Sequence, residues 1–146
     1  MKKLVALIPL AVVIAFSLAA IAGAHRTMSP MMWAAKLTPA QEVPKQAVKN
    51  MAGNGSFTAT LSGTKLKFTL KFAKLTGPVS AAHIHLGAMG KSGNVVVPLC
   101  APCKSPVTGT VVVSTALQKD FSKHLLYVNV HTAKNPAGEI RGQLGM

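Results

Sequence analysis

Three histidines on two short segments are the residues of this chain best suited to chemistry. His83 and His85 lie two residues apart, and His131 falls in a second alternating segment near the C-terminus. Residues two apart in a β-strand project from the same face, so His83 and His85 should point the same way. If the two segments form neighbouring strands, all three imidazoles can converge. Three imidazoles that leave a fourth position open suit zinc or copper.

The same histidines could instead belong to a structural network of polar side chains. Asn129, Glu139 and Arg141 fall on the expected polar faces of nearby segments. The imidazoles could then donate hydrogen bonds to loop carbonyls, and Glu139 and Arg141 could form an ion pair that braces the region. In a metal centre, these polar residues would orient the ligating imidazoles. The sequence leaves the metal centre and the network both open.

The N-terminus has the pattern of a secretory signal peptide. Lys2 and Lys3 precede the uncharged, largely apolar run 4–24, which ends in Ala22-Gly23-Ala24, a small-residue cleavage pattern. Residues 1–24 are therefore predicted to be a signal peptide, and the protein is expected to be secreted or periplasmic. The run 4–24 is also long enough to anchor the chain in a membrane if it stays uncut, which is the alternative.

Cleavage after Ala24 would create a second candidate copper site. His25 would carry a free α-amine beside its imidazole, and Met28, Met31 and Met32 follow it. Imidazole with amine suits Cu(II), and thioethers suit Cu(I). Residues 25–35 show no clear periodicity and are predicted to be a flexible N-terminus. The alternative is a signal-peptide remnant with methionines placed there by chance.

Cys100 and Cys103 form a Cys-Ala-Pro-Cys motif. Outside the cytoplasm a disulfide is expected for such a pair. A thioredoxin-like role needs the motif at a helix N-terminus, but here it follows a strand-like segment and is flanked by prolines. The motif is therefore predicted to staple a loop, with soft-metal binding by the reduced pair as the lesser alternative.

The chain is strongly basic, with 16 Lys and Arg against three acids and a formal charge of +13. Removal of Lys2 and Lys3 would leave about +11 on the mature chain, a charge that attracts acidic glycans, anionic lipid headgroups or acidic proteins. Nucleic acid is not an expected partner, because the basic residues are not interleaved with aromatics. Lys65, Lys67 and Lys71 line one face of a single predicted strand, where a solvated strand face is the simpler explanation.

Three acids without a close pair offer no carboxylates for general acid–base catalysis, so the protein is not expected to be an enzyme. A redox activity at a copper site is the third-ranked alternative. Two functions remain. One is a metal-binding protein, with copper favoured over zinc. The other is an adhesion or interaction module that binds acidic surface glycans or a protein partner.

Short alternating segments recur along the chain, separated by Gly and Pro turns, with one near-helical stretch at 114–123. This pattern predicts an all-β fold, an antiparallel Greek-key β-sandwich of about seven strands. The predicted strands span 55–61, 65–72, 79–86, 94–99, 108–113, 124–132 and 139–144.

The order of motifs resembles the CHRD family, named from chordin. The matching segments are 37–44 (LTPAQEVP), 55–57 (GSF), 81–87 (AAHIHLG), Gly90 with Gly93, 127–132 (YVNVHT) and 135–144 (NPAGEIRGQL). The resemblance predicts a CHRD domain over 36–146. It implies an immunoglobulin-like β-sandwich and an extracytoplasmic module, but no established reaction. It does not extend to 25–33 or to the two cysteines.

Overall fold

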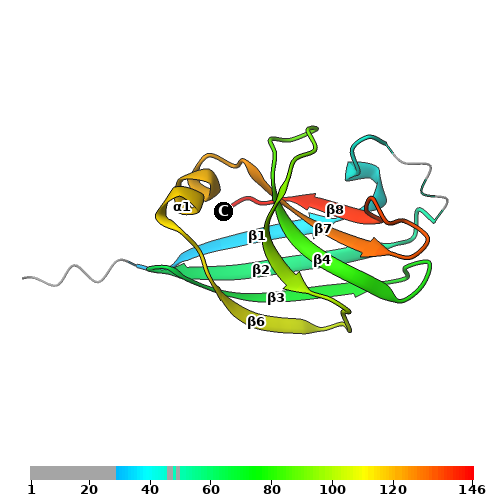
Figure 1. Cartoon of the computed structure of the whole chain (residues 1–146), viewed down its shortest axis with the longest axis horizontal. Coiled ribbons are helices and arrows are strands. Elements are labelled where there is room, and N and C mark those ends of the chain that lie inside the picture. The colour runs from blue at the N-terminus through cyan, green and yellow to red at the C-terminus, as the bar shows by residue number, and fades with distance from the viewer. Residues whose placement is uncertain (1–28, 46–47, 49) are drawn as a thin grey trace, which may run out of the picture.

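Eight strands form two four-stranded antiparallel sheets that pack face to face (Figure 1). The computed structural model describes residues 29–45, 48 and 50–146. The strands are β1 (Met31–Leu37), β2 (Asn54–Ser62), β3 (Lys65–Ala73), β4 (Val79–Leu86), β5 (Val95–Cys100), β6 (Val107–Val112), β7 (Leu126–Thr132) and β8 (Ile140–Gln143). One 3-10 turn, η1 (Pro39–Gln41), and one helix, α1 (Thr115–Ser122), complete the described elements.

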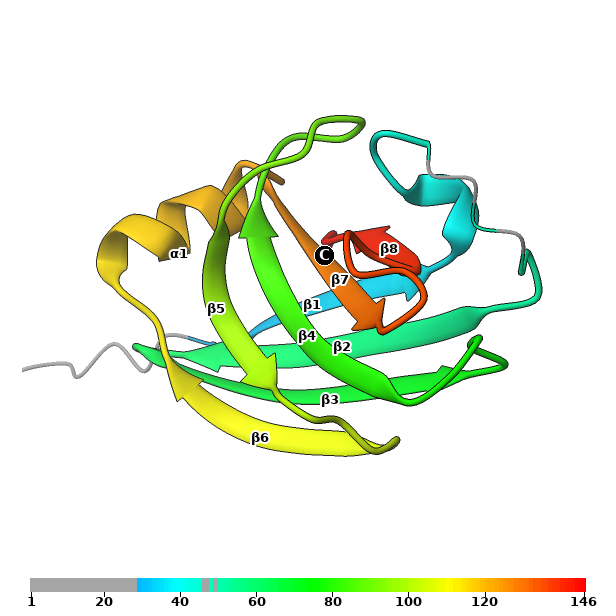
Figure 2. The ribbon, with the colours of Figure 1, turned by 45° about the vertical axis from the view of Figure 1, so that its right-hand side comes forward.

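The strand orders are β1-β2-β3-β6 and β5-β4-β7-β8. The chain crosses between the sheets after β3, β5 and β6, so β3 pairs with β6 and β4 pairs with β7 although neither pair is consecutive in sequence. Figure 2 shows the two layers, with α1 at one end between them. These crossings confirm the predicted Greek-key sandwich, with eight strands instead of about seven.

The β2–β3 hairpin shows why alternation predicts this fold. Its tight turn places Gly63 at φ 56°, a left-handed conformation that glycine adopts without strain. Phe57 and Phe68 face inward, with ring centroids 5.8 Å apart, while Lys67 and Lys71 point outward. One face of the hairpin is therefore core, and the other is the predicted solvated basic face.

The second sheet contributes the other half of the core. Ala82 and Ile84 of β4 and Val128 and Val130 of β7 are fully buried between the sheets. Leu86 continues the alternation of Ala82 and Ile84 but is 39% exposed, because β4 ends there and the chain turns into the β4–β5 loop. The opposite face of this sheet carries the polar side chains of both strands.

The prediction of a flexible N-terminus over 25–35 is wrong for the part that begins at Met31. Residues of β1 pair with β2 along their whole length, and Trp33, Ala35 and Leu37 are buried. Trp33 packs against Phe121 of α1, with ring centroids 5.3 Å apart. Alanine on both faces of β1 weakens its alternation, which explains why the pattern did not indicate a strand. Residues 1–28, including the predicted signal peptide, His25 and Met28, lie outside the described residues.

The predicted short helix and the predicted disulfide are both confirmed. Ser114 caps α1, because its side chain accepts a hydrogen bond from the backbone N–H of Leu117 at 3.2 Å. Cys100 and Cys103 form a disulfide at the end of β5, and the backbone N–H of Cys103 donates to the carbonyl of Val79. No helix in the described part of the chain is long and apolar enough to cross a membrane.

Candidate metal centre

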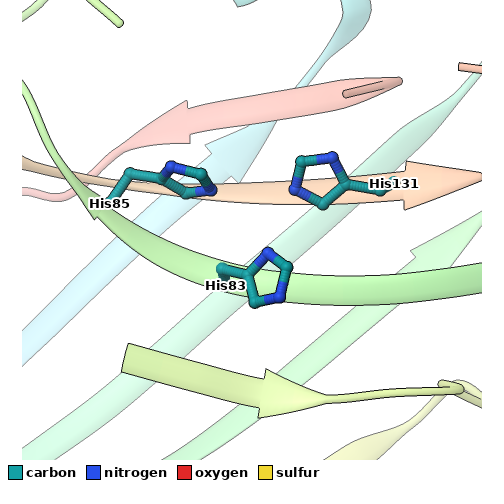
Figure 3. A group of neighbouring side chains, drawn as sticks. All are labelled: His83, His85 and His131. Carbon is teal, nitrogen blue, oxygen red and sulfur yellow. The ribbon is translucent and has the colours of Figure 1, made fainter. Parts of the chain in front are cut away.

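His83, His85 and His131 come together on the outer face of the β5-β4-β7-β8 sheet (Figure 3). β4 and β7 are hydrogen-bonded neighbours, as convergence requires, and their register sets Ala81 opposite His131 and His83 opposite Asn129. His131 is thus diagonal to His83, a separation across which long side chains on one face can meet. We call these residues the three-histidine cluster.

The rings of the three-histidine cluster are in mutual contact. The centroid of His83 lies 5.1 Å from that of His131 and 5.7 Å from that of His85, and His85 lies 5.8 Å from His131. One ring nitrogen from each residue can be chosen so that all three lie within 4.8 Å of one another. Figure 3 shows one nitrogen of each ring turned toward the space between the rings.

Two loop carbonyls set the tautomers of His85 and His131. The Nδ1 atom of His85 lies 3.0 Å from the carbonyl oxygen of Gly93, and that of His131 lies 3.1 Å from the carbonyl oxygen of Pro136. A carbonyl only accepts hydrogen bonds, so each Nδ1 must carry the proton. In the neutral rings, each Nε2 then presents a lone pair, which is the form that binds a metal.

Gly93 packs directly against the backbone of Leu86, which only a residue without a side chain can do. A Cβ at this position would lie 1.6 Å from the carbonyl oxygen of Leu86. The backbone N–H of Gly93 also donates to the hydroxyl of Tyr127 at 3.1 Å, and the ring of Tyr127 stacks on His85 at 4.9 Å. The loop and the tyrosine together hold the imidazole of His85 in one orientation.

Each histidine of the cluster keeps one buried ring nitrogen without a hydrogen-bond partner among the described residues. These atoms are Nδ1 of His83, Nε2 of His85 and Nε2 of His131. Buried polar atoms are nearly always paired, so three orphans in one place need an explanation. A metal ion would satisfy all three at once.

The surroundings favour the neutral form of the cluster. Burial lowers the pKa of His131 to about 4, against an ordinary value of 6.5, although the hydrogen bond to Pro136 opposes the shift. Burial also lowers the pKa of His83 and His85, with repulsion from His85 adding to the effect at His83 and the charge of Arg141 adding to it at His85. The three imidazoles are therefore uncharged at neutral pH, as metal ligands must be.

The spacing is close to what a metal requires. Metal–imidazole bonds are about 2.0–2.1 Å long, so three nitrogens up to 4.8 Å apart would each move inward by about 0.7 Å to bind a three-coordinate ion and by about 0.8 Å to bind a tetrahedral one. The cluster can thus hold a three-coordinate ion or a four-coordinate ion with one position left for water or another ligand.

A family model for the CHRD domain matches residues 33–144, which include the whole cluster. The chain belongs to the CHRD family. The match begins at Trp33, three residues before the predicted start, in agreement with the pairing of β1. No curated protein and no solved structure matches the chain significantly.

In this CHRD domain, Glu139 and Arg141 do not form an ion pair, which was one of the two roles that the sequence left open for them. Glu139 accepts hydrogen bonds from the hydroxyls of Thr76 and Thr132, both at 2.7 Å, from the backbone N–H of Thr76 and from the amide of Asn135. Burial would raise the pKa of Glu139, but these hydrogen bonds together lower it. Glu139 therefore ties the β3–β4 connection to the β7–β8 turn.

Arg141 and Asn129 also bind groups other than the histidines. Nη2 of Arg141 donates to the carbonyls of Lys91 at 2.8 Å and Ala88 at 3.4 Å, which fixes the β4–β5 loop. The amide of Asn129 donates to Oε2 of Glu42 at 3.3 Å. Arg141 thus acts on the cluster through the β4–β5 loop, which also supplies the Gly93 carbonyl, and the hydrogen bonds of His85 and His131 go to loop carbonyls.

Met31 and Met32, the described members of the predicted N-terminal copper site, are neighbours in β1. Adjacent residues of a strand point to opposite faces, so the two thioethers do not converge. His124 is exposed and lies at the edge of Trp33, outside the cluster.

Sequence reasoning assigned no role to Glu42, which the CHRD domain buries to 2% exposure beside Asn129. Gly138, at φ 134°, makes room for it, because a Cβ there would lie 2.7 Å from Oε2 of Glu42. Burial raises the pKa of Glu42 to about 7, although the hydrogen bond from Asn129 and the charge of Arg141 oppose the shift. The sequence offered one sign of this role: Glu42 is one of only three acidic residues, and it lies between the two prolines of the family motif 37–44.

Glu42→Gln should change how stability depends on pH. The folded protein holds the Glu42 proton up to about pH 7, whereas the unfolded chain releases it near 4.5. The contribution of Glu42 to stability is therefore full below 4.5 and falls as the pH rises through 7. The shift is equivalent to about 3 kcal/mol. We expect the free energy of unfolding of Glu42→Gln, measured in urea from pH 4 to 8, to rise by about 3 kcal/mol relative to that of the wild type as the pH increases. A constant difference between the two proteins at every pH would contradict the raised pKa.

Proposed function

We propose that this CHRD protein is an extracytoplasmic metal-binding protein that holds one copper or zinc ion through His83, His85 and His131. The observation that carries the proposal is the set of three buried, unpartnered ring nitrogens, one from each histidine of the cluster. The N-terminal signal pattern and membership of a family associated with extracellular proteins support a location outside the cytoplasm.

Copper is the favoured ion. Among divalent first-row metals, nitrogen ligands bind copper most tightly, and three neutral imidazoles form a nitrogen-only set. Neutral imidazoles also bind Cu(I), so the cluster suits both oxidation states. Zinc fits the same set with water as the fourth ligand, and only a direct comparison of affinities separates the two metals.

Metal content and competition titrations test this proposal. Protein that begins at its native N-terminus is loaded with Cu(I), Cu(II) or Zn(II), desalted and analysed for metal. We expect one ion per chain in the wild type and none in His83→Ala/His85→Ala. His124→Asn is the matched control, because it removes a histidine outside the cluster and asparagine tolerates the left-handed backbone there, at φ 56°.

Equal metal in the wild type and the double variant would refute the cluster as the binding site. Metal that disappears only when residues 25–30, which precede β1, are deleted would move the site to the N-terminal His25 and Met28. If the wild type retains no metal after loading and desalting, the three histidines form a structural network and not a metal site.

A second candidate function is binding to acidic surface polymers. Two of the three acids, Glu42 and Glu139, are buried, so the described surface keeps Asp120 as its only carboxylate side chain. Lys65, Lys67 and Lys71 share the outer face of β3. Retention on a sulfated-glycan column that falls steeply with salt, and falls further in Lys67→Gln, would favour this candidate.

A further inference from the structure

A cavity lined by Glu42 and Arg141 has the features of a ligand site. It has a volume of about 590 Å³, within the range of small-molecule pockets, and lies between the η1 loop, the β4–β5 loop and β8. Figure 2 shows these two loops facing each other above β8. The lining includes Glu42 and Arg141, together with the apolar side chains of Ala40, Val43 and Met89.

Arg141 supplies a fixed positive charge in the cavity. It is only 2% exposed, and its guanidinium carbon lies 3.6 Å from the centroid of the Tyr127 ring. Its hydrogen bonds to described residues all come from Nη2 and reach two loop carbonyls and Gln143, but no carboxylate. A buried guanidinium without a carboxylate partner is an unneutralised charge in a region of low polarity, which favours an anionic ligand.

Glu42 is the second polar group of the cavity. Its Oε2 accepts from Asn129, but its buried Oε1 has no partner among the described residues. Burial raises the pKa of this carboxyl to about 7, so it is protonated below that pH and can donate a hydrogen bond to an anion. Without a ligand, the Oε1 atom of Glu42 has no hydrogen-bond partner among the described residues, and an anion bound to Arg141 would supply one.

We propose that this cavity binds a small organic monocarboxylate, with its carboxylate on Arg141 and Glu42 and its carbon chain along Ala40, Val43 and Met89. A planar carboxylate matches the guanidinium fork. Arg141 is the buried cation of the lining, whereas Lys45 is exposed, so the cavity balances one negative charge in its interior. The apolar lining needs a ligand with a carbon chain, and inorganic phosphate has none. Tyr127 connects the cluster to the cavity lining, because it stacks on His85 on one side and under Arg141, which lines the cavity, on the other.

The test uses protein stripped of metal with a chelator, which is then dialysed away. Binding of hexanoate to this protein is measured by calorimetry and by changes in amide chemical shifts. We expect a Kd below about 1 mM. Shifts should concentrate at Gly90 and Lys45, on opposite sides of the cavity. Hexan-1-ol, which lacks the charge, and inorganic phosphate, which lacks the chain, should each bind at least about tenfold more weakly.

Two variants and one control locate the site. Arg141→Lys keeps the charge but loses the fork and should weaken hexanoate binding by about tenfold. Met89→Asp places a negative charge on an exposed side chain of the lining, so it should weaken binding without disturbing the fold, even if Arg141→Lys displaces the loop. Lys65→Met, on the outer face of the other sheet, should have no effect.

The proposal is overturned if hexanoate shows no binding at about 10 mM, tenfold above the expected limit of the Kd. It is also overturned if hexan-1-ol or inorganic phosphate binds as tightly as hexanoate. It is also overturned if Lys65→Met weakens binding as much as Met89→Asp, because general surface charge would then explain the result. Metal-free protein is used throughout, so failure here leaves the metal proposal untouched, and failure of the metal proposal leaves this one intact.

Discussion

Adding excess Cu(II) to the metal-free protein should raise the midpoint of thermal unfolding by roughly 10–20 °C. A ligand present at 100 to 1,000 times its Kd stabilises the folded state by about 3–4 kcal/mol. For a domain of this size, each kcal/mol corresponds to about 3–5 °C. The cluster joins two neighbouring strands and is held by two loops, so the ion would bind the folded chain and would find no such arrangement in the unfolded one.

The rise in midpoint should disappear in His131→Ala and persist in His124→Asn. His131 is the histidine that β7 contributes, so its loss leaves only the two ligands of β4. Circular dichroism at a fixed protein concentration and increasing copper follows the effect. An equal rise in both variants would mean that copper binds elsewhere, and a fall in the wild type would mean that copper binds the unfolded chain more tightly.

The faces of the strands could be predicted from the sequence, but their neighbours could not. Alternation put His83 and His85 on one face because side chains in a strand repeat every two residues. Nothing local shows that β4 pairs with β7, since β5, β6 and α1 lie between them in the chain. The alternation and the turns predicted the sandwich, and the family resemblance agreed with it, but neither specified that β4 pairs with β7.

The partners of the polar residues could not be predicted, because loops supply them. Glu139 and Arg141 share a face, but residues two apart in a strand are separated by about 7 Å, which is too far for an automatic ion pair. Each is instead satisfied by the loop that covers it: hydroxyls and an amide for Glu139, backbone carbonyls for Arg141. Alternation marks these positions as polar and outward, and it contains no information about a covering loop.

β1 was missed for a different reason. Buried and exposed positions do alternate from Trp33 to Leu37, but two of the intervening residues are alanines, whose small side chains suit either environment. The burial of Trp33 comes from tertiary contact with Phe121, which is 88 positions away in the sequence numbering. Only the folded chain shows that this strand closes one side of the core.

Trp33→Ala should destabilise the domain by about 3–5 kcal/mol, the range for removing a large aromatic side chain from a core. Trp33 is 1% exposed and packs against Phe121, so its removal opens a cavity between β1 and α1. Met32→Ala is the matched control, because Met32 is the next residue of the same strand but is 68% exposed, and it should change the free energy of unfolding by less than about 0.5 kcal/mol.

Urea unfolding followed by far-ultraviolet circular dichroism compares the three proteins, since Trp33 is the only tryptophan and its fluorescence is lost in the variant. Trp33→Phe should recover much of the stability, because the indole Nε1 has no hydrogen-bond partner among the described residues and no such bond is lost. If Trp33→Ala lowers the free energy of unfolding by less than about 1 kcal/mol, β1 does not close the core and the original prediction of a flexible N-terminus would hold. A strand that closes the core would lose more stability with its largest side chain.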